Sequence, residues 1–376
     1  MGGTVDMGDQ ERERPLRRGW TTGACATAAT RAAYEALVTG RFPDPVEIAL
    51  PSGSRVAFTL ANSELLPEGV ARAGVVKDAG DDPDVTHGAL VRSTVSRGPA
   101  GSGVVFRAGE GVGTVTKPGL PIPPGEPAIN PVPREMMRQA IREVVERFGG
   151  SGDVVVEISI PGGQDLAAKT MNGRLGIVGG LSILGTTGIV VPFSCAAWIH
   201  SIHRAIDVAV ATGVDHVAGA TGSTSEGAVQ RLHGLPEGAL IEMGDFVGGM
   251  LKYLRRHPVR RVTIAGGFAK MTKLGQGLLD LHSGKGQVDR AWLANLLREA
   301  NAPADLVERC REANSALQVL QEAERRGVAV GALVARAARK TAQDVLEGSE
   351  IEIDTVVFDR EGRLVGEAHD DRRNRR

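Results

Sequence analysis

Residues 77–88, KDAGDDPDVTHG, place four carboxylates within seven residues. They are Asp78, Asp81, Asp82 and Asp84, with Lys77 before them and His87 after them. Such a cluster could bind a metal ion, form a solvated turn, or position and deprotonate a substrate. A calcium loop requires Gly at its sixth position and Glu at its twelfth. Counted from Asp82, these positions hold His87 and Ser93, so the cluster does not match a calcium loop.

The residues before the acids, GVARAGVV, have the pattern of an apolar strand. This pattern predicts that Lys77 and Asp78 lie at the end of a strand. On composition alone, an Asp, Pro and Gly segment is most simply a solvated turn. Its place directly after an apolar strand also favours a role in an active site.

Histidines provide a second group of candidates. His200, His203 and Asp207 have the spacing of one helical face. The expected helix has no third convincing ligand, so we interpret these histidines as surface or hydrogen-bonded residues and predict no protein-bound metal. His282 follows GLLDL in an expected loop and is a better active-site candidate, although a structural role is equally open.

Three successive segments of the second half each read as a strand, a turn and a helix. They are residues 214–232, 238–257 and 260–282. Three such units in succession predict a parallel sheet, whose ligands bind beyond the carboxyl ends of the strands. The turns at that edge are residues 219–227, 242–245 and 266–273.

One of these turns has features of a nucleoside site. Gly222 and Ser223 stand where backbone amides approach a ligand at a helix start, and Glu242 ends the next strand 20 residues after Gly222. A Rossmann site places an acid there to bind ribose hydroxyls. The spacing suits an adenosine ligand, but GATGSTSEG is not GxGxxG, so a dinucleotide is not favoured. A purely structural glycine-rich turn remains an equal alternative.

The first half mixes strand and helix patterns. Thr21 and Thr22 precede an Ala-rich segment that ends at Gly40, which predicts a capped, closely packed helix with exposed N–H groups suited to anions. Cys25, in this segment, is expected to be a small core residue. Strand patterns occupy residues 46–116, and GEGVG at 109–113 is interpreted as a hairpin turn because no helix follows it.

Composition narrows the function further. The 376 residues include 44 basic and 45 acidic side chains, which argues against binding nucleic acid by bulk charge. Only eight of the basic residues are Lys; the Arg excess would suit a polyanionic small ligand, or simply reflect genome composition. Three Cys without a CxxC, a polar N-terminus and a Gly-rich apolar stretch at 175–199 predict a cytoplasmic protein outside the membrane.

The expected fold class is therefore α/β: an α+β N-terminal domain and a Rossmann-like C-terminal domain with a parallel sheet. The predicted boundaries are a disordered tail at 1–15, an α+β substrate domain at 16–192, a Rossmann-like cofactor domain at 193–348 and a C-terminal hairpin with a tail at 349–376.

Several stretches together resemble one known family. They are LRRGWTTGACATAAT, VVKDAGDDPDVTHG, GEGVGTVTKPGL, GEPAINPVPRE, RLGIVGGLSILGTTGIVVP, GDFVGGML and GGFAKMTKLGQG with LHS after it. Over residues 16–366 the chain resembles the CbiD family, the cobalt-precorrin-5B C(1)-methyltransferases of anaerobic cobalamin biosynthesis. The resemblance implies methyl transfer from S-adenosylmethionine to carbon 1 of a cobalt-bound macrocycle. Cobalt then arrives inside the substrate.

The resemblance, together with the strand–turn–helix pattern of the second half, suggests roles for individual residues. The expected catalytic residues, which position the ring edge or manage a proton, are Asp78 and Asp81. The expected donor-binding residues are Gly222, Ser223, Glu242, Asp245, Gly266 and Lys270. The expected substrate-binding residues are Thr21, Thr22, Lys77, Lys117, Arg134 and His282. The chain departs from the family pattern at 220–223, 244–246 and 267–270, where the family usually has other side chains.

Two other classes of function stay open at this stage. The strand–turn–helix units could serve a nicotinamide-dependent macrocycle reductase, or the protein could be a non-catalytic tetrapyrrole carrier. Neither a partner nucleic acid nor a membrane is expected, and an oligomer of identical chains is compatible with the sequence.

Overall fold

The computed structural model describes residues 15–370 and divides them into two compact units. Within the described chain, unit 1 comprises residues 15–115, 125–173 and 177–194, and unit 2 comprises residues 116–124, 174–176 and 195–370. The disordered tail predicted for residues 1–15 lies outside the described residues up to residue 14, as does the end of the predicted C-terminal tail from 371.

Unit 1 is built on a five-stranded sheet in the order β4-β5-β6-β9-β7. Its strands are β4 (Asn62–Leu66), β5 (Val70–Val76), β6 (Leu90–Arg97), β7 (Val104–Ala108) and β9 (Val154–Ser159). Pairing is antiparallel except between β7 and β9, which run parallel. The prediction that a strand ends directly before Lys77 is confirmed by β5.

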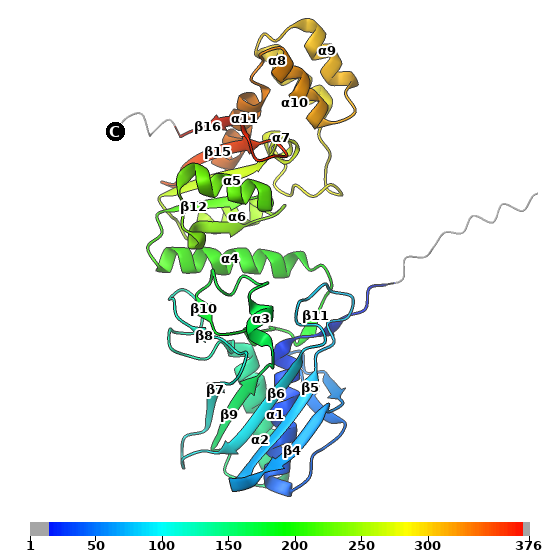
Figure 1. Ribbon diagram of the computed structural model, residues 1–376, viewed down its shortest axis with the longest axis vertical. Coiled ribbons are helices and arrows are strands. Elements are labelled where there is room, and N and C mark those ends of the chain that lie inside the picture. The colour runs from blue at the N-terminus through cyan, green and yellow to red at the C-terminus, as the bar shows by residue number, and fades with distance from the viewer. Residues whose placement is uncertain (1–14, 371–376) are drawn as a thin grey trace, which may run out of the picture. The chain divides into compact units, whose positions relative to one another are not determined.

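Two long helices cover one face of this sheet, as Figure 1 shows: α1 (Thr22–Thr39) and α2 (Pro131–Phe148) lie behind β5, β6 and β9. Thr21 caps α1 by accepting a hydrogen bond from the backbone N of Ala24 at 3.1 Å, and Gly40 ends it in the left-handed region. Both ends agree with the sequence prediction.

The Ala-rich face of α1 packs closely because its side chains are small. Cys25 is fully buried there, and burial raises the pKa of its thiol to about 12, which keeps it protonated.

Shorter elements complete unit 1. They are β1 (Gly19–Trp20) with β11 (Ile189–Val190), β8 (Thr114–Val115) with β10 (Ile177–Val178), β2 (Val46–Ala49) with β3 (Arg55–Phe58), α3 (Gly163–Ala167) and the 3₁₀ turn η1 (Pro67–Gly69). GEGVG is not a hairpin turn, because β7 pairs with β9 and β8 pairs with β10. A Cβ on Gly111 would lie 1.9 Å from the carbonyl oxygen of Ile160, so only glycine fits this loop.

Unit 2 contains a second five-stranded sheet in the order β13-β12-β14-β15-β16. Its strands are β12 (His216–Ala220), β13 (Leu240–Glu242), β14 (Arg261–Gly267), β15 (Glu352–Phe358) and β16 (Leu364–Ala368). The first four run parallel, and β16 pairs antiparallel with β15. The parallel sheet and the closing hairpin agree with the sequence prediction.

Helices cover both faces of this sheet. One face packs on α5 (Ser223–His233) through a small cluster that includes Ala218, Ala228 and Val356. The other faces a larger core, to which the remaining helices contribute. They are α4 (Cys195–Ala211), α6 (Val247–Leu254), α7 (Phe268–Gly275), α8 (Arg290–Glu299), α9 (Ala304–Glu312), α10 (Ala316–Arg325) and α11 (Val330–Val345), while the 3₁₀ turn η2 (Glu237–Ala239) precedes β13.

The boundaries of the units differ from those predicted. The segment 349–376 was expected to form a separate hairpin, but β15 pairs with β14 along seven residues and so belongs to the sheet of unit 2. Residues 116–124 and 174–176, predicted within the substrate domain, group with unit 2, where Arg174 forms an ion pair with Glu226 at 2.6 Å.

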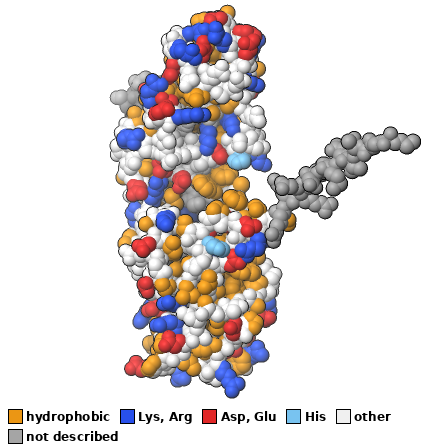
Figure 2. All heavy atoms as spheres, turned by 45° about the vertical axis from the view of Figure 1, so that its right-hand side comes forward, with side chains coloured by type: hydrophobic (Ala, Val, Ile, Leu, Met, Phe, Trp, Pro, Cys, Tyr) orange, Lys and Arg blue, Asp and Glu red, His pale blue; other side chains and the backbone are white. Residues whose placement is uncertain are grey.

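The surface agrees with the nearly balanced composition. On the face shown in Figure 2, basic and acidic side chains are interspersed rather than gathered into a large patch of one sign. Between residues 15 and 370, no helix is both long and apolar enough to cross a membrane.

Candidate active site

Unit 2 has a cavity of about 480 Å³ at the carboxyl edge of its sheet. Strand β12 has β13 on one side and β14 on the other, so the chain turns in opposite directions after these strands. This arrangement is a topological switch point, where open parallel sheets bind their ligands. The volume of the cavity lies in the range of sites that bind small molecules.

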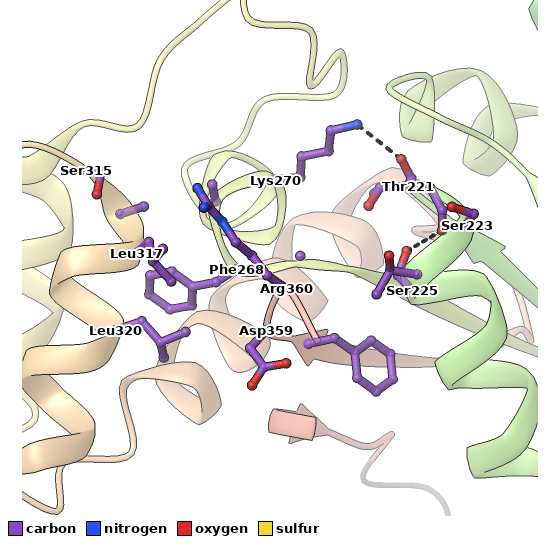
Figure 3. Close-up of a pocket in the computed structure, with 16 residues that line it drawn as sticks. Thr221, Ser223, Ser225, Phe268, Lys270, Ser315, Leu317, Leu320, Asp359 and Arg360 are labelled. Carbon is purple, nitrogen blue, oxygen red and sulfur yellow. Dashed lines mark hydrogen bonds between the residues drawn. The ribbon is translucent and has the colours of Figure 1, made fainter. Parts of the chain in front are cut away.

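The cavity is lined by the loops that follow three parallel strands and by the start of α10 (Figure 3). After β12 the lining residues are Thr221, Gly222, Ser223, Thr224 and Ser225; after β14 they are Gly267, Phe268, Ala269 and Lys270; from α10 they are Ser315, Ala316, Leu317 and Leu320; and from β15 and its turn they are Phe358, Asp359 and Arg360.

Three helices therefore begin at this cavity: α5, α7 and α10. The first N–H groups of a helix have no partner within the helix and carry partial positive charge. Gly222 and Gly267 precede α5 and α7 without a side-chain cap, and a Cβ on either would meet nothing within 4 Å. The backbone at these two starts is thus open to a ligand.

The six predicted donor-binding residues fall into two groups. Gly222, Ser223 and Lys270 line the cavity, while Gly266 lies directly before it, so close to Thr221 that a Cβ would be 2.9 Å away.

The other two predicted donor-binding residues follow the neighbouring strand and do not line the cavity. Glu242 is exposed at the end of β13, opposite Ala220 of β12, and its backbone oxygen accepts a hydrogen bond from Trp198 Nε1 at 3.2 Å. Asp245 lies 2.9 Å from Lys270 Nζ, which also donates to the backbone oxygen of Thr221 at 3.1 Å. Lys270 follows β14 and therefore links its end to the segments after β12 and β13.

The wall of the cavity formed by α10 and by the turn after β15 was not expected from the sequence. Arg360 belongs to the segment that was interpreted as a C-terminal hairpin, and Leu317 belongs to a part of the predicted cofactor domain in which no site residue was expected. Had the apolar run IEIDTVVF been read as a fourth parallel strand, the residues after it would have been expected at the same edge.

The acidic segment of unit 1 is a folded turn in which each carboxylate has a partner. Asp78 pairs with the guanidinium of Arg17, Asp81 accepts from the backbone N of Arg17 at 2.6 Å, and Asp82 accepts from the backbone N of Phe193 at 2.9 Å. Asp84 lies 2.6 Å from Lys77 Nζ. The turn thus fastens residues 17–20 and the end of the 189–193 segment to β5.

In the part of the chain that is described, no three His, Cys, Asp or Glu side chains are grouped to hold a metal.

Charge states in the turn follow from these partners. Hydrogen bonds from Arg17, and then from the backbone N of Gly80, lower the pKa of Asp78 to about 2. Burial raises the pKa of Asp84, but hydrogen bonds and the charge of Lys77 outweigh burial and leave this pKa lowered. Both carboxyl groups are therefore ionised at neutral pH.

The predicted substrate-binding residues of unit 1 are mostly engaged in internal contacts. The hydroxyl of Thr22 is buried and accepts a hydrogen bond from the backbone N of Leu184 at 3.0 Å, and that of Thr21 caps α1. Lys77 is only 1% exposed and pairs with Asp84. Arg134 donates to the backbone oxygen of Ile129 at 2.8 Å. These side chains hold the framework around α1 and α2.

The two remaining predicted substrate-binding residues belong to unit 2. Lys117 Nζ donates to the backbone oxygen of Arg174 at 3.3 Å. His282 is exposed in a loop, as predicted, where its Nδ1 accepts a hydrogen bond from the backbone N of Gly284 at 3.1 Å. Neither residue lines the cavity.

The helix that carries His200 and His203 is confirmed as α4. The ring of His203 stacks on Tyr253 at 3.9 Å between centroids, and Tyr253 donates a hydrogen bond to Asp207 Oδ1 at 2.7 Å. Burial, followed by the charge of Arg204, lowers the pKa of His200. This cluster is a packed junction of α4 and α6.

Known proteins match the chain over nearly all of its length. A relative from Bradyrhizobium sp. (strain BTAi1), named cobalt-precorrin-5B C(1)-methyltransferase, is 70% identical over 94% of both chains. One of the same name from Paramagnetospirillum magneticum is 60% identical over 95% of this chain and 99% of the relative. The family models CbiD and CbiD, C-terminal domain match residues 9–192 and 280–369. The chain belongs to the CbiD family. The resemblance and the α/β fold class inferred from the sequence are thereby confirmed.

A crystal structure described as cobalamin biosynthesis protein (cbiD) from Archaeoglobus fulgidus is 27% identical, over 76% of this chain and 85% of that chain, with a TM-score of 0.39. The two CbiD family models leave residues 193–279 between them unmatched. This stretch carries β12, β13 and β14 and all six predicted donor-binding residues. Family membership therefore assigns no role to any of these six residues.

Proposed function

We propose that this CbiD-family protein transfers a methyl group from S-adenosylmethionine to carbon 1 of cobalt-precorrin-5B, giving cobalt-precorrin-6A. The observation that carries the proposal is the 70% identity, over 94% of both chains, to a relative of that name. The aligned region of 353 residues extends over both units of this chain.

The switch-point cavity of unit 2 is the proposed donor site. Its position at the ends of β12 and β14 supports a nucleoside ligand, because open parallel sheets bind such ligands there. In this proposal Gly222 and Ser223 bind the donor through their backbone, Glu242 and Asp245 lie at the ribose side, and Gly266 and Lys270 flank the methionine end. When bound, the donor supplies an electrophilic methyl group on sulfur.

The proposed substrate is a ring fringed with acetate and propionate groups. Thr21, Thr22, Lys77, Lys117, Arg134 and His282 stay our proposed contacts for these groups. Since Thr21, Thr22 and Lys77 are buried, they would act through the backbone and the framework that they hold. Positioning is the main task of the protein, because the donor is already activated.

Asp78 and Asp81 are the proposed catalytic residues. A pKa of about 2 makes Asp78 a weak proton acceptor at neutral pH, which favours positioning over deprotonation. Asp81→Asn keeps an oxygen that accepts from the backbone of Arg17 and removes the charge. We expect this change to lower turnover at least tenfold and to leave donor affinity within twofold; a collapse of donor affinity would contradict the assignment of the turn to the substrate.

Calorimetric titration with S-adenosylhomocysteine tests the proposed function directly. Binding, together with transfer of labelled methyl to carbon 1 of the added ring, supports the methyltransferase. Binding of NADPH in place of S-adenosylhomocysteine would indicate a reductase, and binding of the corrinoid alone would indicate a carrier. A cytoplasmic location and a homo-oligomer stay predictions, which fractionation and light scattering would check.

A further inference from the structure

Arg360 is a charged residue of the cavity with no role in the proposed reaction so far. It lies in the turn between β15 and β16 and lines the cavity with Asp359 and Phe358. Its side chain is exposed, and within residues 15–370 its guanidinium has no hydrogen bond or ion pair. A five-donor guanidinium that faces a cavity without a partner is available for a planar anion.

The neighbouring charges do not neutralise Arg360. The carboxylate of Asp359, the one acidic side chain of the lining, is 2.9 Å from Arg363 Nε and accepts from the backbone N of Arg363 at 2.8 Å. Burial raises the pKa of Asp359, but its hydrogen bonds to Arg363 outweigh burial and keep the group ionised and engaged. In Figure 3 its side chain points away from that of Arg360.

The remaining polar groups of the lining favour a negative charge. Lys270 is the second cation of the lining, but its ammonium lies 2.9 Å from Asp245 and in Figure 3 points toward Thr221, so Arg360 is the cation of the lining that is left for a ligand. The starts of α5, α7 and α10 add the partial positive charge of three helices. A sulfonium, which is a cation, gains nothing from this end of the cavity, but a carboxylate does.

We infer that Arg360 binds the carboxylate of the donor's methionine moiety and so selects S-adenosylmethionine over donors that lack this group. The inference rests on the proposed function. In this orientation the adenosine of the donor lies toward the ends of β12 and β13, near Glu242. The carboxylate of the donor lies toward α10 and the turn after β15.

The test compares S-adenosylmethionine with decarboxylated S-adenosylmethionine, which differs only by the carboxylate. Both are titrated calorimetrically into the full chain without acceptor. We expect the wild type to bind the carboxylate form about tenfold more tightly, Arg360→Ala to bind both forms with the weaker affinity, and Arg360→Lys to fall between them. Since Arg360 has no partner within the described chain, Arg360→Ala is expected to fold, which circular dichroism checks.

Arg363→Lys is the matched control, because this residue belongs to the same turn, does not line the cavity, and as lysine keeps a positive charge beside Asp359. It should keep the tenfold preference. If the wild type discriminates and Arg360→Ala discriminates equally, the inference fails and the proposed function stands. If the wild type binds neither compound, both fail. Binding of NADPH that is lost in Arg360→Ala would reassign the residue to a phosphate.

Discussion

At the scale of single residues, the acidic segment shows how a catalytic-looking sequence can have a structural task. Lys77 was expected to bind substrate, yet its side chain is 1% exposed and its Nζ lies 2.6 Å from Asp84. A buried ammonium is costly unless it is paired. Asp84 therefore compensates for the burial of Lys77, while Asp78 and Asp81 remain nearer to solvent.

The Lys77–Asp84 pair gives an asymmetric prediction. Asp84→Ala should lower the free energy of unfolding by about 3 kcal/mol, because it leaves the Lys77 ammonium buried without a counter-charge. Lys77→Met should cost about 1 kcal/mol, because an apolar chain fills the same space. Urea unfolding measures both, with Thr86→Val as the control for the hydroxyl that Asp84 also binds. A larger loss in Lys77→Met would show that this interpretation is wrong.

His216 predicts a pH dependence of folding. Burial, followed by the charge of Arg261, lowers the pKa of His216 to about 4, and its Nε2 lies 2.9 Å from Thr263 Oγ1. In the unfolded chain the pKa returns to about 6.5. As the pH falls from 6.5 to 4 the unfolded state therefore binds a proton that the folded state does not, and stability falls.

At pH 5 this difference should amount to about 1–2 kcal/mol of unfolding free energy, relative to pH 7.5. We expect His216→Gln to lose less stability over this pH interval than the wild type does. Urea titrations at the two values measure the difference, and the exposed His282, changed to Gln, serves as the control. Equal pH dependence in wild type and His216→Gln would contradict the prediction.

At the scale of elements, the start of α1 organises one end of unit 1. Thr21 caps the helix, and the turn at Gly185 lies so close to it that a Cβ there would be 2.4 Å from Thr21 Oγ1. Thr22 binds the backbone of the same segment at Leu184. The two threonines therefore join a helix start to a loop some 160 residues away in the sequence.

Loss of the cap should be measurable. Thr21→Ala is expected to lower the free energy of unfolding of unit 1 by about 1 kcal/mol, because the backbone N of Ala24 loses its partner. Thr39→Ala, at the exposed end of the same helix, is the matched control and should change stability by less than about 0.5 kcal/mol. Equal effects of the two changes would contradict a capping role.

At the scale of the whole molecule, residues 15–370 contain three hydrophobic cores, one in unit 1 and two in unit 2, and the proposed donor site belongs to unit 2. The core of unit 1 gathers around α1, α2 and the first sheet. The cores of unit 2 lie on the two faces of the second sheet, below the cavity. Each unit should therefore respond separately to a ligand that binds only one of them.

Hydrogen exchange tests this separation. S-adenosylhomocysteine at a hundred times its dissociation constant stabilises the unit that binds it by about 2.7 kcal/mol. We expect slower exchange of amides in residues 221–226, 267–270 and 358–360, and unchanged exchange in α1 and β5. Protection that appears first in unit 1 would show that the donor site has been placed in the wrong unit.

The sequence by itself determined the local elements: the cap at Thr21, the strand that ends before Lys77, the three strand–helix units and the glycine turns at 222 and 267. Periodicity and capping act over a few neighbouring residues, so they can be read without a fold. The family could also be recognised from the sequence, because several short motifs of this chain resemble those of the family and follow one another in the same order.

Only the tertiary structure decided which of these elements meet. It joined β15 to β14, and this pairing placed Arg360 and the start of α10 at the same edge as Gly222 and Lys270. It also buried Lys77 and gave each acid of the 78–84 turn a partner far away in the sequence or across the turn. Pairing between distant strands, and the desolvation of charges that follows, depend on the packing of the whole chain, which no local pattern encodes.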